Sequence, residues 1–455
     1  MIEKLLEKIP ADVLGIAQRL REKGKRGWIV GGCVRDLLRG EPAKDWDIAT
    51  DALPEEVVGM FRKVIPTGIQ HGTVTVVVDR VHYEVTTLRG EGAYSDGRRP
   101  DKVEFVDDIT RDLARRDFTM NAIAIDPVDG KLIDPFGGRR DLENKTIRAV
   151  GEPLQRFTED GLRVLRAARF AATLECTIEE STEVAMGDPA SLATFKRVSQ
   201  ERVRDEWLKA MKAKRPSVAF EAMRRTAILP ITCPEIMESV GVAQNKWHAF
   251  DVWGHAMACL DACKPEPILR VAALLHDVGK PRTRAFSDKT HDYTFYEHER
   301  IGAEMTEPIL MRLKFSNEER AKITNLVRHH LICYAESWTD AAVRRWVKRV
   351  TPELAPELYE IGFADALGKG RDAHEDIENI ERLRERVGAL MAAGAALSAK
   401  DLALNGRDVM TELGMKPGRA VGELLEKLLD VVMEDPSANT RERLLDEAKK
   451  IISRA

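Results

Sequence analysis

The chain has 455 residues, which is too long for one ordinary hydrophobic core, so we expect two to four domains. Its composition of 44% hydrophobic, 32% charged and 6% aromatic residues is that of a globular protein and excludes a largely disordered chain. A formal net charge of −4 excludes a protein coated with positive charge, although a local basic stripe is compatible with it.

Cysteine usage and the apolar pattern predict a cytoplasmic protein. The first 24 residues mix charges into an amphipathic helical period, and no later stretch approaches eighteen apolar residues in a row, so neither an export leader nor a membrane span is predicted. The cysteines are scattered, without a CxxC pair, and are expected to be reduced thiols. They are Cys33, Cys176, Cys233, Cys259, Cys263 and Cys333.

Strand-like runs alternate with turns over the first third of the chain. These runs are 28–30, 46–50, 74–78, 82–88, 102–106 and 122–126. After about residue 141 the apolar positions recur almost throughout with helical spacing. The pattern predicts an α+β head followed by an all-α body.

Loops that interrupt the helical pattern predict the domain boundaries. A proline-initiated loop begins at residue 234, and a glycine-rich, charged stretch ends the following region near residue 372. The expected domains are a head (1–140), a helical neck (141–233), a histidine-bearing region (234–372) and a helical tail (373–455).

A glycine pair follows the first strand-like run, in the stretch WIVGGCVRDLLRGEPAKDWDIAT (28–50). We expect a strand to enter Gly31 and Gly32 and a short helix to leave them. Because glycine has no side chain, backbone N–H groups there can approach a phosphate at the start of the helix. A tight strand-to-helix turn without a ligand explains the glycines by themselves equally well.

Two aspartates stand two residues apart in the next strand-like run. Asp45 and Asp47 are therefore expected on one exposed strand face, with Trp46 and Ile48 pointing into the core. Two such carboxylates repel each other unless a cation lies between them, and hard oxygen ligands suit Mg²⁺. Surface strands often carry such pairs, but together with the glycine corner this pair favours a bound nucleoside triphosphate and its metal.

A third acid lies on a later strand. Glu84 is expected to face away from Tyr83 and Val85. It is either the third carboxylate of a two-metal site or an ordinary solvent-facing residue.

The stretch GGCVRDLLRGEPAKDWD (31–47) resembles the signature of class II tRNA nucleotidyltransferases and bacterial poly(A) polymerases, members of the polymerase beta superfamily. The resemblance implies a polymerase-beta-like nucleotidyltransferase head. It also implies catalytic roles for Asp45, Asp47 and Glu84, with Mg²⁺ held by Asp45 and Asp47.

Two later stretches agree with this family in the same order. The first, LARRDFTMNAIAID (113–126), resembles its RRDFTxNA segment. The resemblance implies that Arg115, Arg116 and Asp117 contact the triphosphate and sugar and that Asn121 supports the site. By itself the stretch is also explained as a helix with a salt-bridged polar patch.

The second stretch is FTEDGLRVLRAARF (157–170), in which Thr158 is expected to cap a helix whose first turn is acidic. A glycine in that turn does not suit this explanation. Asp160 and Arg163 are expected on one helical face, where an acceptor beside a guanidinium donor matches cytosine and adenine but not uracil or guanine. The resemblance implies that Glu159, Asp160 and Arg163 select the base.

By this resemblance the nucleotide-binding residues are Gly31, Gly32, Arg35, Arg115, Arg116, Asp117, Asn121, Glu159, Asp160, Arg163 and Arg166. Between the first two motifs, residues 89–106 (RGEGAYSDGRRPDKVEFV) resemble the flexible loop that members of the family need to switch from adding C to adding A. Its presence argues against an enzyme that adds only C.

Histidines and aspartates recur over residues 255–365 in an H…HD…H…H…D order, which resembles an HD phosphohydrolase domain. A lone histidine on a helix is usually structural, but the series weakens that explanation. By resemblance one metal is bound by His255, His276, Asp277 and Asp365. His298 and His329 contribute to a second metal site or to phosphate binding. Mixed histidine and carboxylate ligands suit Mn, Ni, Fe or Zn better than Mg, and the region either hydrolyses phosphate esters or only contacts RNA.

Two basic stretches are compatible with RNA binding. Residues 196–215 hold eight Lys or Arg against three acids, and the tail resembles the C-terminal helical region of bacterial tRNA nucleotidyltransferases. In the tail, phosphate contacts are expected from Lys400, Arg407, Lys416 and Arg419. Ordinary solvated helix faces explain both stretches about as well.

The combined motifs imply a CCA-adding tRNA nucleotidyltransferase, with tRNA, CTP and ATP as partners and no membrane or DNA role. An A-adding partner enzyme and a poly(A) polymerase remain open, because their motifs are very similar, and a non-catalytic RNA-binding protein is the alternative from another class. Uridylyltransferases that modify signalling proteins and guanosine tetraphosphate synthetase-hydrolases also join a nucleotidyltransferase to an HD domain. The order of domains and the helical tail count against both.

Overall fold

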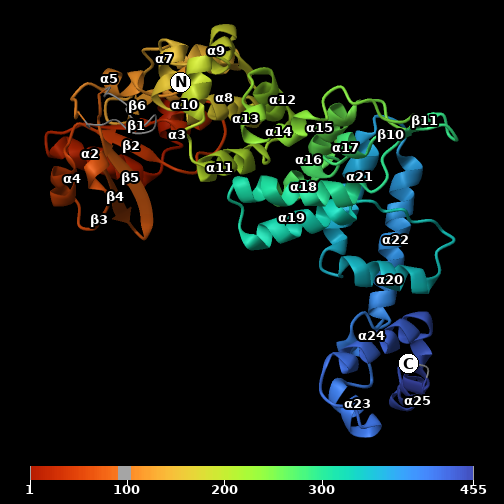
Figure 1. The fold of residues 1–455 in the computed structure, drawn as a ribbon. Helices are drawn as coiled ribbons and strands as arrows, with labels where there is room; N and C mark the ends of the chain where they lie inside the picture. The colour runs from red at the N-terminus through yellow and green to blue at the C-terminus, as the bar shows by residue number, and fades with distance from the viewer. Residues whose placement is uncertain (1, 91–103, 454–455) are drawn as a thin grey trace. The chain divides into compact units, whose positions relative to one another are not determined.

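The computed structural model describes residues 2–90 and 104–453, and the chain forms two compact units, Met1–Pro234 and Glu235–Ala455, called unit 1 and unit 2 below (Figure 1). The expected α+β class is confirmed, because unit 1 carries a seven-stranded sheet and the rest is almost entirely helical. The predicted boundaries at 140/141, 233/234 and 372/373 stay predictions about domains. No described helix is both long and apolar enough to cross a membrane.

The sheet of unit 1 has the strand order β3-β4-β5-β2-β1-β6-β7. Its strands are β1 (Gly27–Val30), β2 (Asp47–Thr50), β3 (Val64–Gly68), β4 (Thr73–Val78), β5 (Val81–Thr87), β6 (Ala124–Asp126) and β7 (Lys131–Ile133). Only β2 and β5 pair in parallel, and every other neighbouring pair is antiparallel. Five of these strands were expected near their observed positions, whereas β3 and β7 were not predicted.

The strand predicted at 102–106 is wrong for its described part. Residues 101–103 lie outside the described residues, and Phe105 makes only an isolated bridge with Arg89. The described part of this segment runs beside the end of β5, where the backbone N–H of Gly90 donates to Glu104 and that of Val106 donates to Leu88.

Alternation along the strands divides the core of unit 1 between the two sheet faces. Ile29 and Ile48 belong to a cluster on one face that includes residues of α2 (Ala11–Glu22), whereas Trp28, Val30 and Ala49 belong to a cluster on the other. Asp47 is two residues before Ala49, so its side chain lies on the second face, at the first position of β2.

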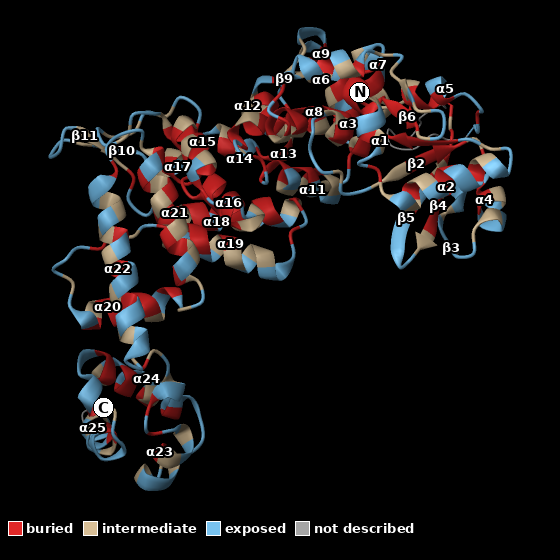
Figure 2. Cartoon of the chain, turned by 180° about the vertical axis from the view of Figure 1, so that it is seen from behind, coloured by how far each residue is buried: buried red, intermediate tan, exposed pale blue. Residues whose placement is uncertain are grey.

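Helices complete unit 1. They are α1 (Ile2–Leu6), α2, α3 (Gly32–Leu38), α4 (Pro54–Met60), α5 (Ile109–Ala114), α6 (Gly138–Glu143), α7 (Pro153–Glu159), α8 (Leu162–Thr173), α9 (Glu180–Met186), α10 (Pro189–Phe195), α11 (Gln200–Ala210), α12 (Ser217–Arg225) and α13 (Leu229–Thr232). A short parallel pair, β8 (Thr146–Ile147) with β9 (Thr177–Ile178), links the segment after the sheet to the segment after α8. Most of α8 is buried, as its red colour in Figure 2 shows. Its buried residues include Val164, Ala167 and Ala168.

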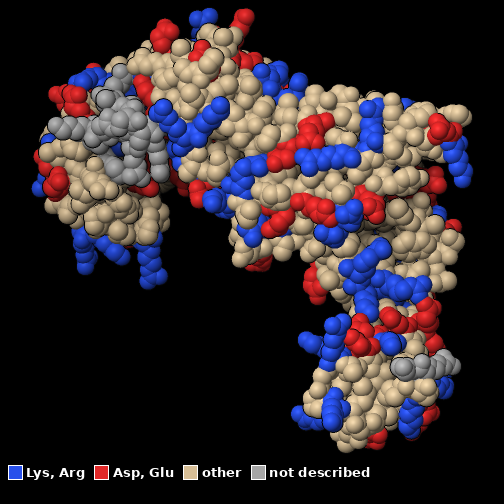
Figure 3. Space-filling view, in the orientation of Figure 1, with Lys and Arg blue, Asp and Glu red and all other residues tan. Residues whose placement is uncertain are grey.

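Unit 2 is a helical assembly with one small hairpin, β10 (Ala285–Ser287) and β11 (Asp292–Thr294). Its helices are α14 (Pro234–Met237), α15 (Val252–Ala262), α16 (Pro267–Leu275), α17 (Lys280–Thr283), α18 (His298–Arg312), α19 (Asn317–His329), α20 (Asp340–Val350), α21 (Ala355–Gly368), α22 (His374–Ala392), α23 (Gly406–Leu413), α24 (Arg419–Glu434) and α25 (Arg441–Ser453). The last three enclose a separate apolar cluster that includes Leu404, Leu428 and Leu444. On the face of unit 2 shown in Figure 3, basic and acidic side chains lie interspersed.

Candidate functional site

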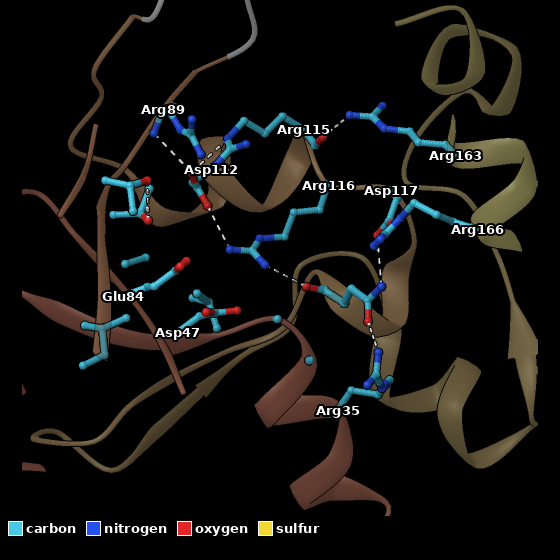
Figure 4. Close-up of a pocket in the computed structure, with 18 of the residues that line it drawn as sticks. Arg35, Asp47, Glu84, Arg89, Asp112, Arg115, Arg116, Asp117, Arg163 and Arg166 are labelled. Atoms are coloured by element: carbon cyan, nitrogen blue, oxygen red, sulfur yellow. Dashed lines mark hydrogen bonds and ion pairs between the residues drawn. The ribbon is translucent and has the colours of Figure 1, made fainter. Parts of the chain in front are cut away.

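A cleft of about 480 Å³ opens in unit 1 over the end of β1, the start of β2 and the middle of β5. Most of the side chains that line it are charged. Figure 4 shows Asp47 and Glu84 on one side of the cleft and arginine side chains around its other sides. The predicted residues in its wall are Gly31, Gly32, Arg35, Asp47, Glu84, Arg115, Arg116, Asp117, Asn121, Asp160, Arg163 and Arg166. Two predicted residues, Asp45 and Glu159, do not line this cleft.

The glycine pair forms the corner between β1 and α3. Gly31 has a φ of +79°, a conformation that other residues rarely adopt. A Cβ added at Gly31 would lie 2.7 Å from Nη1 of Arg116. Glycine is therefore needed both for the turn and for the close approach of an arginine to the backbone.

The central carboxylates lie beside each other because their strands are in register. Asp47 is the first residue of β2 and pairs with Glu84 of β5 in the parallel ladder. Burial raises the pKa of Asp47, and the charges of Glu84 and Asp45 add to the effect against the opposing charge of Arg116. Carboxylates gathered this way offer hard oxygen donors to a divalent cation, which would relieve their mutual repulsion.

Asp45 is not part of the strand, contrary to the sequence prediction. It lies in a bend before β2 and is exposed, and Trp46 packs only partly buried against the core. Because β2 starts at Asp47, the two aspartates do not share a strand face. Asp45 instead lines a neighbouring cleft of about 690 Å³, which also touches Asp47 and Glu84.

Asp112, which the sequence analysis missed, organises the arginine side of the cleft. Its buried carboxylate accepts from Arg115 Nη2 at 2.6 Å and lies 3.4 Å from Arg116 Nη2, and it also accepts from the backbone N–H of Arg89. Burial alone would raise the pKa of Asp112, but the positive charges of Arg115 and Arg116 lower it. The signal in the sequence was the spacing of three and four residues along α5.

Asp117 and Asn121 connect the cleft to α8. Asp117 accepts from Arg166 Nη2 at 2.6 Å and from the amide of Asn121 at 3.0 Å, and Asn121 in turn accepts from Arg35 Nη1 at 2.9 Å. Although burial opposes ionisation, Arg166 and these hydrogen bonds lower the pKa of Asp117 to about 2. The carboxylate of Asp117 therefore orients Arg166 directly and Arg35 through Asn121.

The predicted N-cap at Thr158 is wrong. Thr158 lies in the last turn of α7, where its hydroxyl donates to the carbonyl oxygens of Leu154 and Gln155. Helix α7 ends before Asp160, and Oδ1 of Asp160 accepts from the backbone N–H of Leu162, the first residue of α8, at 3.0 Å. A Cβ at Gly161 would lie 2.6 Å from the backbone of Phe195, so close packing of α10 explains the glycine.

The two outer members of the EDxxR segment contact each other. Glu159 Oε2 accepts from Arg163 Nη1 at 2.8 Å, and its other oxygen lies 2.7 Å from Arg156. Glu159 thus supports Arg163 from outside the cleft, while Asp160 pairs with Arg202 of α11. Arg202 belongs to the basic stretch 196–215 but was not singled out from the sequence.

The loop expected to act in switching, residues 89–106, lies mostly outside the described residues, at 91–103. Its two ends are joined by backbone bonds from Gly90 to Glu104 and from Val106 to Leu88.

A second group of ionisable side chains is buried in unit 2. Nε2 of His255 lies 3.2 Å from Asp277, 3.0 Å from Asp365 and 3.2 Å from Nε2 of His276. The other carboxylate oxygen of Asp277 lies 3.2 Å from Nε2 of His298, which is 3.3 Å from Nε2 of His330. Asp277 therefore stands between two groups of imidazoles, one at each oxygen.

The hydrogen bonds of the imidazoles fix which nitrogen is available. Nδ1 lies 2.7 Å from a backbone carbonyl oxygen in His276, His298 and His330 alike. A carbonyl oxygen only accepts, so Nδ1 carries a hydrogen, and in the neutral form of each ring Nε2 then turns its lone pair into the cluster. Lys280 already places one cation here, because its Nζ lies 2.6 Å from Oδ2 of Asp277. Neutral imidazoles whose Nε2 atoms lie about 3 Å from each other and from a carboxylate still repel unless a cation lies among them, so the donor set fits a metal ion.

The expectation for His329 is wrong, because His330 takes its place in the cluster. Adjacent residues at the end of α19 point about 100° apart, so the half-buried His329 faces a different cavity, lined also by Lys322 and Arg349. Burial lowers the pKa of His330 to about 3. Cys259, one turn after His255, was also missed and lies 3.4 Å from Nε2 of His255.

The tail cations predicted to meet RNA phosphates are all exposed. Lys400, Arg407 and Lys416 lie in the loops and helices around α23, and Arg419 starts α24 with an ion pair to Glu423 at 2.7 Å.

Three known protein families match separate parts of the chain. The family described as "Poly A polymerase head domain" matches residues 27–148, and "Probable RNA and SrmB-binding site of polymerase A" matches 176–239. A tRNA nucleotidyltransferase domain 2 family matches 298–448. The first match contains the glycine corner and the carboxylates.

Curated relatives align with nearly the whole chain. The chain is 32% identical over 454 residues to a CCA-adding enzyme of Ligilactobacillus salivarius, covering 98% of this chain and 99% of the relative. It is 33% identical over 446 residues to a CCA-adding enzyme of Geobacillus sp., covering 95% and 94%. Among solved structures, the Bacillus stearothermophilus CCA-adding enzyme in complex with CTP aligns with a TM-score of 0.71 at 30% identity, over 97% of this chain and 98% of that one.

Proposed function

The chain belongs to the family of CCA-adding enzymes, a class of tRNA nucleotidyltransferases, and we propose that it adds C, C and A without a template to the 3′ end of tRNA, using CTP and ATP. The observation that carries this proposal is the cleft of unit 1, where paired carboxylates face an arginine-rich wall that also includes Asp160 and Arg163. Similarity to CCA-adding enzymes along nearly the whole chain supports tRNA as the acceptor.

In the proposed reaction the 3′ hydroxyl oxygen of the RNA attacks the α-phosphate in line, a phosphodiester bond forms, and pyrophosphate leaves. Arg116 and Arg115, both held by Asp112, bind the negative charge of the triphosphate and keep it in line with the carboxylates. Gly31 and Gly32 leave room for the phosphates at the corner between β1 and α3.

Enzymes of this family use a divalent metal such as Mg²⁺. We propose that Asp45 and Asp47 hold it, with Glu84 as a third carboxylate. The bound ion would lower the pKa of the attacking hydroxyl and neutralise charge on the leaving group. Burial and the neighbouring acids raise the pKa of Asp47. A bound cation would counter this by stabilising the ionised carboxylates.

Base selection is assigned to Asp160 and Arg163. The Asp160 carboxylate accepts from the exocyclic amine of cytosine or adenine, and the Arg163 guanidinium donates to the neighbouring ring nitrogen. Uracil and guanine present a carbonyl oxygen and an N–H group at these places, so they face like partners and are rejected.

Product analysis with three RNAs distinguishes CCA addition from A addition alone and from poly(A) synthesis. Labelled CTP and ATP are offered separately and together to tRNA lacking CCA, to tRNA ending in CC and to an unrelated RNA. Two C and one A added to the first RNA supports the proposal. Addition of A to tRNA ending in CC alone would point instead to an A-adding partner enzyme, and long A tails on unrelated RNA to a poly(A) polymerase.

For unit 2 we propose a metal-dependent phosphohydrolase site at the histidine cluster. The supporting observation is that Nε2 of His255, His276 and His298 lies 3.1–3.2 Å from the carboxylate oxygens of Asp277, so that side chains of the kind that bind transition metals meet at one point. His255, His276, Asp277 and Asp365 would hold one transition metal (Mn, Ni, Fe or Zn), and His298 with His330 a second through the other oxygen of Asp277. The metal would supply an activated water for attack on a phosphate ester.

Metal analysis tests this second site independently of activity. The wild type and His276→Ala are dialysed and their Mn, Ni, Fe and Zn contents measured, with His329→Ala as the matched control. We expect the metal in the wild type and the control and its loss from His276→Ala. Equal metal contents in all three would contradict the site, and assays with a phosphomonoester and a 2′,3′-cyclic nucleotide then report turnover.

A further inference from the structure

Asp160 and Arg163 both line the cleft, but they are held in different ways. Arg163 donates to the carbonyl oxygens of Arg156 at 3.0 Å and Arg115 at 2.9 Å, and to the carboxylate of Glu159 at 2.8 Å. Two of these acceptors are backbone atoms, so the fold itself fixes the guanidinium.

Asp160 depends on one side chain from another helix. Nη2 of Arg202, in the first turn of α11, lies 3.0 Å from Oδ2 and 3.3 Å from Oδ1 of Asp160. Oδ1 also accepts from the backbone N–H of Leu162, whereas Oδ2 accepts from Arg202 alone. Oδ2 therefore keeps acceptor capacity for a ligand in the cleft.

Arg202 contacts the carboxylate from behind the cleft wall. Asp160 lines the cleft and Arg202 does not, so the ion pair leaves the place of a base free. Among the described residues, Asp160 is the one carboxylate within ion-pair distance of Arg202. One turn later on α11, the buried Glu206 accepts from Arg169 of α8 at 2.5 Å, so α11 is anchored to the helix that follows Asp160.

We propose that Arg202 is a positioning residue for nucleotide selection. It holds the Asp160 carboxylate turned so that Oδ2 accepts from the amine of cytosine or adenine. Without Arg202 the carboxylate is tethered through Oδ1 only and can rotate away from the base, and the repulsion that rejects a carbonyl oxygen weakens. This inference rests on the proposed nucleotidyl transfer and names a determinant of its specificity.

The test measures discrimination between CTP and UTP as a ratio of kcat/KM on tRNA lacking CCA. We expect Arg202→Gln to lower this ratio about tenfold, with most of the change in KM for CTP. Arg202→Lys, which keeps the charge, retains the fold and recovers part of the ratio. The matched control is Arg204→Gln on the same helix, whose guanidinium pairs with the neighbouring Asp205 and whose substitution leaves the ratio unchanged.

A double-mutant cycle separates positioning from general support of the fold. If Arg202 acts through Asp160, Arg202→Gln changes discrimination in the wild type but not in an Asp160→Asn background. An unchanged ratio in Arg202→Gln, or an equal loss in both backgrounds, overturns the proposal. Failure of the proposed function would appear differently, as absence of C addition by the wild type.

Discussion

The cleft of unit 1 and the histidine cluster of unit 2 both gather ionisable side chains, but the cluster is more deeply buried, and only Asp365 at its edge keeps 22% of its side-chain surface exposed. In the cleft Glu84 is exposed, and the side chains of Arg115 and Arg116 each keep 20% of their surface exposed. In the cluster, His255, His276 and Asp277 are almost completely buried.

The difference teaches what each site is built to receive. The cleft presents guanidinium donors already oriented by Asp112 and Asp117, which suits a large anion that enters and leaves. The cluster presents imidazole and carboxylate groups that face one another, which suits a small cation that stays. Loss of one site should therefore leave the other intact.

The largest expected effect comes from the carboxylates of the cleft. We expect Asp47→Ala to slow CMP incorporation by about a thousandfold or more, because the charge that stabilises the transition state is lost. The metal content of unit 2 should not change. Rates are measured under single turnover beside Asp107→Ala, an exposed acid before α5, and a drop of less than tenfold would argue against the assigned role.

A stability change confined to unit 1 comes next. Gly161→Ala should lower the free energy of unfolding by about 1–3 kcal/mol, because the new methyl group would overlap the backbone of Phe195. Gly59→Ala in α4, where nothing lies within 4 Å, is the matched control and should be neutral or slightly stabilising. Both are measured by urea denaturation, and equal midpoints would contradict the packing explanation.

The pH dependence of stability provides a third test. The pKa of Asp117 falls from 3.8 to about 2 in the folded protein. A lowered pKa stabilises the fold above the unfolded value, and this contribution, about 2 kcal/mol, is lost as the pH falls from about 4 to about 2. The wild type should therefore lose more stability over this interval than Asp117→Asn, whereas parallel curves would mean that the carboxylate is not specially stabilised.

The smallest effect distinguishes two adjacent histidines. His329→Gln should change stability by less than about 0.5 kcal/mol and leave metal content unchanged. His330→Gln should reduce metal content, because its Nε2 faces the cluster. Equal behaviour of the two variants would show that the side-chain directions at the end of α19 are misassigned.

Much of unit 1 could be predicted from the sequence because its motifs are contiguous. The glycine corner at Gly31, the acid at Asp47 and the helix that carries Arg163 each depend on spacing within a few residues. These local periods, together with the order of the motifs, were enough for the α+β class and the family.

The remaining features depend on contacts between segments distant in sequence, or on which of two nearby residues begins a strand or faces the interior. Arg202 reaches Asp160 across 42 positions, and Gly161 is needed only because Phe195 packs against it. Asp45 was misplaced because the pattern does not show that β2 begins two residues later. His329 was preferred to His330 because a pair of identical residues carries no information about which one faces inward.

The most direct test of the central claim, that the cleft and not the histidine cluster carries nucleotidyl transfer, is the initial rate of CMP incorporation by His276→Ala. The account predicts a rate within about twofold of the wild type, even after the variant has lost its metal. A loss of addition comparable to that of Asp47→Ala, in a protein with an unchanged melting temperature, would contradict it.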